Sequence, residues 1–103
     1  TATDGIEKYY WDNSEQLNSL AWNATELTAQ PQHMKEADRW IVRSIELDEN
    51  YYNLDTRAWI QYKLGNNDLA KSLANKAIAA AKKAGEPEES YKSTLELLEM
   101  LRK

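Results

Sequence analysis

Apolar residues recur at three- and four-residue spacing along most of this chain, which is the spacing of one face of an α-helix. Five segments show the pattern, at about 15–30, 32–47, 51–64, 68–84 and 88–102. No stretch alternates apolar and polar residues for long enough to form a β-strand. Only 3 glycines and 2 prolines interrupt the chain, and abundant Ala, Leu, Glu and Lys favour helix. We therefore expect an all-α fold.

The predicted inward faces differ between segments, and the fourth is mostly alanine. In order, the inward residues are Leu17, Leu20, Ala21, Ala24 and Leu27; Met34, Ala37, Ile41, Ser44 and Ile45, with Trp40 flanking; Leu54 and Ala58 with Gln61 or Tyr62, and Trp59 beside them; Leu69, Ala70, Leu73, Ala74, Ala77, Ile78 and Ala81; and Tyr91, Leu95, Leu98 and Leu101. Alanines on facing helices let two backbones approach closely. This favours a helical hairpin that packs on a second hairpin.

The helix ends carry recognisable signals. Ser14 is a suitable N-cap for the first helix, and Pro31 ends it or begins the next connection. Gly65 suits the left-handed position after a helix, and Asn67 or Asp68 can cap the helix that follows.

Parts of the chain repeat. An Ala-Trp pair at Ala21 occurs again at Ala58, 37 positions later, and a second set of matches follows at a shift of 33. Two helical hairpins with a closing helix are typical of stacked helical repeats. We expect a lead-in over residues 1–13 and one domain over 14–103, with repeats at about 15–48 and 51–84 and a capping helix at about 88–102. The lead-in contains the aromatic cluster Tyr9–Trp11, either a cover for the stack or the remnant of an interface.

The second hairpin resembles the tetratricopeptide repeat. The residues that carry the likeness are Ala58, Leu64, Gly65, Ala70, Ala77 and Ile78. Gln61 and Ala74 stand where that motif usually has aromatic residues, and its closing proline is missing after both repeats. The resemblance implies antiparallel hairpins stacked as a short right-handed array.

A narrower resemblance is to the helical domain that follows a thioredoxin-like domain in some bacterial envelope proteins. It is carried by the segments 17–22, 44–48, 53–58, 62–65 and 76–78. It implies a C-terminal fragment of a periplasmic protein, with any thiol-disulfide chemistry in the missing domain. The start at Thr1, without a methionine or a signal peptide, is what we expect of an excised domain.

Repeats of this type line a concave face with the first helix of each hairpin. Equivalent positions predict a protein-binding groove made of Glu15, Asn18, Trp22, Thr25, Tyr52, Asp55, Trp59 and Tyr62. Aromatic residues beside adaptable polar groups are typical of binding hot spots. The alternative is that residues 6–11 or the last helix cover both tryptophans as core.

Composition narrows the function. The 103 residues carry a net charge of −4 and no cysteine, which argues against a nucleic-acid partner and against thiol chemistry within this chain. No apolar run approaches the roughly 20 residues of a membrane span. His33 is the sole histidine, and no glycine-rich phosphate loop is present. We expect neither a cofactor nor a metal site.

The expected function is that of a non-enzymatic protein-interaction or scaffolding domain of a larger protein. Its partner would be a protein, a peptide or a covalently linked neighbouring domain. The alternative is a structural appendage that orients a thioredoxin-like oxidoreductase domain. Small-molecule binding between the helices has the least support, because alanine-rich seams leave little cavity. The sequence indicates no particular oligomeric state and, apart from the periplasmic resemblance, no particular compartment.

Overall fold

The computed structural model describes residues 13–27 and 31–102, and these residues form helices without any β-strand. The helices are α2 (Ser14–Leu27), α3 (Pro31–Leu47), α4 (Tyr51–Lys63), α5 (Asn67–Lys83), the 3₁₀ turn η1 (Glu88–Tyr91) and α6 (Lys92–Leu101). The all-α prediction is confirmed. The Tyr9–Trp11 cluster and almost all of the predicted lead-in lie outside the described residues.

The second, third and fourth predicted segments begin and end within one residue of α3, α4 and α5. The single capping helix predicted from residue 88 is wrong in detail. The amide of Ser90 donates to the Pro87 carbonyl at 2.9 Å, the tighter 3₁₀ pattern. Tyr91 then leaves the α-helical region with φ −117° and ψ 23°, so α6 starts only at Lys92.

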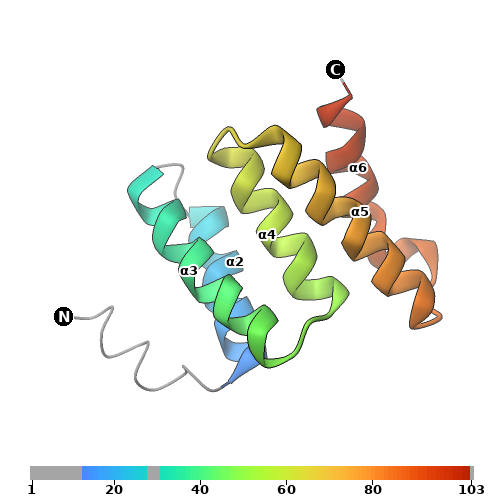
Figure 1. The fold of residues 1–103 in the computed structure, drawn as a ribbon, viewed down its shortest axis with the longest axis horizontal. Coiled ribbons are helices and arrows are strands. Elements are labelled where there is room, and N and C mark those ends of the chain that lie inside the picture. The colour runs from blue at the N-terminus through green and yellow to red at the C-terminus, as the bar shows by residue number, and fades with distance from the viewer. Residues whose placement is uncertain (1–12, 28–30, 103) are drawn as a thin grey trace.

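The helices pack mainly against their neighbours in the chain. α2 packs on α3, α3 on α4, α4 most extensively on α5, and α5 on α6. Figure 1 shows α3, α4 and α5 in a row, with α4 and α5 running in opposite directions. α2 also packs against α4, which brings the two predicted groove helices together.

Three apolar clusters include residues of α4, and the smallest joins Tyr51 to Ala81 and Tyr91; the other two are larger. One is built from α2, α3 and α4, and its buried members are Leu17, Ala21, Ala37, Trp40, Ile41 and Ile60. The other is built from α4, α5 and α6, and its buried members are Leu54, Ala58, Leu73, Ala74, Ala77 and Leu97. The predicted alanine seam is confirmed, because Ala58, Ala70, Ala74 and Ala77 are all 0% exposed.

Some predicted inward residues are placed differently. Leu69 is 39% exposed, because it lies in the first turn of α5, ahead of the seam that begins at Ala70. Trp40 was expected to flank the core but is buried in it. On the last helix the fully buried residues are Thr94 and Leu97, while Leu95 is half-buried. The predicted inward residues still pack on the apolar clusters, with Tyr91 buried and Leu95, Leu98 and Leu101 partly buried.

Helix caps also differ from the expectation. Asn13, and not Ser14, caps α2, since its side-chain oxygen accepts from the Gln16 amide at 3.0 Å. The Ser14 hydroxyl instead donates to the Ser44 carbonyl of α3 at 2.9 Å. Gly65 has φ 88°, in the left-handed region as predicted. Asn66 precedes α5 as its N-cap residue without a capping side-chain bond, so the capping role expected of Asn67 or Asp68 is wrong.

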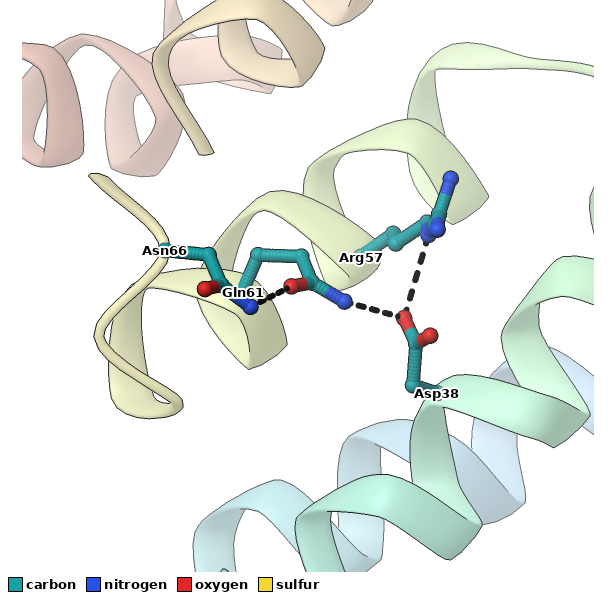
Figure 2. A network of polar contacts seen from close by, with 4 residues as sticks. All are labelled: Asp38, Arg57, Gln61 and Asn66. Atoms are coloured by element: carbon teal, nitrogen blue, oxygen red, sulfur yellow. Dashed lines mark hydrogen bonds and ion pairs between the residues drawn. The ribbon is translucent and has the colours of Figure 1, made fainter. Parts of the chain in front are cut away.

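A polar network fastens α3 to α4 (Figure 2). The Asp38 carboxylate accepts from Arg57 Nε at 3.0 Å and from Gln61 Nε2 at 2.8 Å. The Gln61 oxygen in turn accepts from Asn66 Nδ2 at 2.7 Å. Gln61 is buried, so both ends of its amide are satisfied at the position where the tetratricopeptide motif usually has an aromatic ring.

Candidate functional site

Four of the predicted groove residues line one cavity of about 220 Å³ between α2, α4 and the η1–α6 segment. They are Asn18, Trp22, Tyr52 and Asp55, and the other described residues lining it are Ser19, Tyr51, Thr56, Ser90 and Thr94. α2 and α4 provide seven of its nine described lining residues, and η1 and α6 provide one each. We call this space the aromatic cavity.

Asp55 is a largely buried carboxylate in the aromatic cavity. Its Oδ1 accepts from Thr94 Oγ1 at 2.6 Å, and its Oδ2 accepts from Ser93 Oγ at 3.4 Å. Desolvation raises the pKa of Asp55 above its ordinary value, and the donors from α6 oppose this only in part. Among the described residues, no basic side chain forms an ion pair with Asp55.

The aromatic side chains of the cavity differ in exposure. Tyr52 is 58% exposed and Trp22 is half-buried, whereas Tyr51 is buried. The ring centroids of Tyr51 and Tyr52 lie 3.9 Å apart with the rings tilted by 32°. Burial, with the neighbouring Tyr52 and Glu86, raises the pKa of Tyr51 to about 12. Tyr51 therefore remains a neutral phenol, and Tyr52 presents its ring to solvent.

A second cavity of about 500 Å³ continues from the first along α2 and the start of α4. It shares Asn18, Ser19 and Tyr52 with the aromatic cavity and adds Ser14, Glu15, Asp48 and Asn50. We call the two cavities together the α2–α4 groove. Among the described residues, its lining contains three acidic side chains (Glu15, Asp48 and Asp55) and no lysine or arginine.

The other three predicted groove residues lie outside both cavities. Thr25 is buried, and its hydroxyl donates to the Ala21 carbonyl at 2.8 Å. Trp59 and Tyr62 are half-buried on the apolar cluster that includes Leu97 of α6. Their rings meet edge to face, with centroids 6.0 Å apart. Trp59 thus packs on the chain's own apolar cluster, whereas Trp22 lines the aromatic cavity.

The Trp59 indole N–H is buried and makes no hydrogen bond by distance and angle. It is nevertheless close enough to Asp55 to favour the charged carboxylate. Trp59 thus contributes to the surroundings of Asp55 without lining the aromatic cavity.

Sequence reasoning missed the polar residues that η1 and α6 bring to the cavity, Ser90 and Thr94. Ser90 lies in the unexpected 3₁₀ turn and Thr94 in the first turn of α6, and neither belongs to a predicted groove helix. It also missed Tyr51, Ser19 and Thr56, which are on the two predicted groove helices but not at the counted positions. The adjacent tyrosines at the start of α4 were the signal in the sequence that Tyr51 could join Tyr52 at the groove.

No group of three or more His, Asp or Glu side chains that could hold a metal occurs within residues 13–27 and 31–102. His33 is exposed beside a separate cavity lined by Ala24, Gln32, Glu36 and Trp40. In the same part of the chain, no helix is long and apolar enough to cross a membrane. No protein-family model, curated protein or solved structure matches the chain.

Proposed function

We propose that this chain is a non-enzymatic protein-interaction domain that binds a partner through the α2–α4 groove. The observation that carries the proposal is the convergence of Asn18, Trp22, Tyr52 and Asp55 on one cavity from two different helices. The helices belong to a short tetratricopeptide-like array in this proposal, with α2 and α4 as its groove-lining helices.

The exposure of Tyr52 supports this function. A tyrosine that is 58% exposed at the rim of a cavity offers a large apolar ring to a partner at low conformational cost. Interface hot spots are enriched in tyrosine and tryptophan that lie next to pockets. The groove also offers hydrogen-bonding groups on Asn18, Ser19 and Ser90, which can fix the register of a bound chain.

A second candidate function is a helical appendage that orients a neighbouring domain, for which a thioredoxin-like oxidoreductase domain is the expected parent. It is supported by Trp59 and Tyr62, which pack on the chain's own apolar cluster instead of facing a partner. Under this proposal the contact with the neighbouring domain is permanent and covalently tethered.

Selection of a random peptide library on the immobilised 103-residue chain tests the interaction function. Tyr52→Ala removes the exposed ring, and Leu69→Ala is the matched control, since Leu69 is 39% exposed and lines neither cavity of the groove. We expect enriched peptides that bind the wild type and the Leu69 variant but lose affinity for the Tyr52 variant. Failure to enrich any peptide, or equal binding to all three proteins, would contradict the proposal and leave the appendage as the better function.

A further inference from the structure

The charged side chains among the described residues that line the α2–α4 groove are all acidic. Glu15 and Asp48 lie in its larger cavity and Asp55 in its smaller one, and no described lining residue is basic. Two basic side chains of α4 itself make contacts outside the groove. Arg57 pairs with Asp38 at 3.0 Å, and Lys63 Nζ donates to the Thr25 carbonyl at 2.7 Å. An occupant that brings positive charge therefore meets attraction along the whole groove.

Asp55 directs the preference of the groove for positive charge to the aromatic cavity. Within residues 13–27 and 31–102, Asp55 has lost much of its hydration and has no cationic partner, so its carboxylate retains unused acceptor capacity. Each Asp55 oxygen receives one hydroxyl donor from α6, whereas a carboxylate has about four acceptor positions. A positively charged donor placed in the aromatic cavity would use the remaining positions.

A second acceptor and two rings define the shape of that donor. Asn18 lines both cavities, and its buried side-chain oxygen has no hydrogen-bond partner in the part of the chain that the structure describes. Trp22 and Tyr52 line the same cavity as Asp55. A guanidinium group is planar, stacks on aromatic faces and carries five N–H donors, so it can serve two separate acceptors at once. An ammonium is a compact point charge without that planar face.

We infer that the aromatic cavity binds the arginine side chain of a basic segment of a partner protein, with Asp55 and Asn18 accepting its hydrogen bonds and Trp22 and Tyr52 contacting its plane. The larger cavity, with Glu15 and Asp48, then receives a neighbouring basic residue of the same segment. This inference rests on the proposed interaction function and specifies the class of partner.

Nuclear magnetic resonance titration of the 103-residue chain with short acetylated peptides tests the inference. The first peptide contains one arginine among glycines, the second has lysine in its place, and the third has citrulline, which keeps the shape of arginine without its charge. We expect saturable shifts of the Trp22 indole N–H and the Asn18 side-chain amide with the arginine peptide. The citrulline peptide should bind roughly 10-fold more weakly, since a charged hydrogen-bonded contact is lost.

Two variants locate the site. Asp55→Asn should weaken binding of the arginine peptide by roughly 10- to 100-fold, whereas Asp68→Asn removes the same formal charge from an exposed position of α5 and should leave affinity unchanged. Tyr52→Ala should weaken binding roughly two- to fivefold, as expected for one exposed cation–π contact. Because Tyr52 is mostly exposed, this variant keeps its fold and supplies a second readout that does not depend on Asp55.

The possible failures separate the two proposals. Equal or tighter binding of the lysine or citrulline peptide would overturn the arginine inference and leave the interaction function standing. So would a library selection whose Tyr52-dependent peptides lack basic residues. Shifts spread over the acidic surface, with equal loss in both aspartate variants, would mean nonspecific charge attraction and would also overturn it. Absence of any binding in both experiments would refute the interaction function itself.

Discussion

Replacing Asp38 by alanine should destabilise the domain more than any other loss of a single polar side chain described above. Asp38 accepts two hydrogen bonds from α4, at 2.8 Å from Gln61 and 3.0 Å from Arg57. Gln61 is only 4% exposed. Its amide N–H would therefore stay buried without its acceptor after the substitution, and water could replace the carboxylate only in part.

The magnitude follows from the exposure of each partner. A hydrogen bond to a charged group contributes about 1.5–3 kcal/mol, and the buried Gln61 should approach that range. The Arg57 pair is more exposed, with side chains 26% and 21% accessible, and pairs of this kind contribute about 0.2–1 kcal/mol. We expect a loss of roughly 3 kcal/mol, which lowers the melting temperature of a domain of this size by roughly 10–25 °C.

Urea unfolding followed by circular dichroism measures this loss. Glu96→Ala is the control, since Glu96 is an exposed acid on α6, and it should stay within about 0.5 kcal/mol of the wild type. In a Gln61→Met background, Asp38→Ala should cost at least about 1.5 kcal/mol less unfolding free energy than it does in the wild type, because no buried donor is then left unpaired. A loss of under about 0.5 kcal/mol for Asp38→Ala, or full additivity of the two changes, would refute the reasoning.

Three further predictions concern other parts of the fold. The folded-state pKa of Asp55 is raised, so the ionised carboxylate lowers the free energy of unfolding, and this loss is recovered as pH falls. Asp55→Asn should therefore raise the free energy of unfolding at pH 7. Urea titrations should show that the difference between variant and wild type becomes smaller in acid. Ala77→Leu overfills the α4–α5 seam, where Ala77 is 0% exposed, and should lower the free energy of unfolding by about 1–3 kcal/mol. Ala79→Leu, at an exposed position of the same helix, is the control and should cost under about 0.5 kcal/mol. Thermal melts of both variants measure the difference. Gly65→Ala should cost about 1–2 kcal/mol because φ is 88°, although nothing lies within 4 Å of the added methyl group; Gly65→Asn should cost less, and equal stability of both would contradict the backbone argument.

Much of the helical framework could be predicted because it depends on the spacing of apolar and turn-forming residues that are close in sequence. The start of α4 at Tyr51 and the left-handed Gly65 follow from periodicity and turn chemistry that involve only neighbouring residues. The alanine seam could be recognised because Ala70, Ala74 and Ala77 share one helix face, and buried small residues on one face imply a close helix neighbour.

The features that escaped prediction depend on contacts between elements far apart in sequence. Asp38 and Gln61 lie 23 positions apart, and no helical period marks them as partners. Thr94 reaches Asp55 across 39 positions, and only the phase of α6 decides that it does. That phase changes at Tyr91, where the backbone leaves the α-helical region. Tertiary packing thus determined which of the predicted groove residues line the α2–α4 groove and which do not.

The α4–α5 pair has a consequence for the order in which the protein folds. Only Leu64–Asn66 separates the two helices, so closing the loop between them costs little entropy. Their seam is built largely from alanine, whose side chain has no rotamers to lose. Local contacts of this kind form early. We expect α4–α5 to be the folding nucleus: changes in the seam should slow folding, while loss of the Asp38 network, which docks α3 afterwards, should mainly accelerate unfolding.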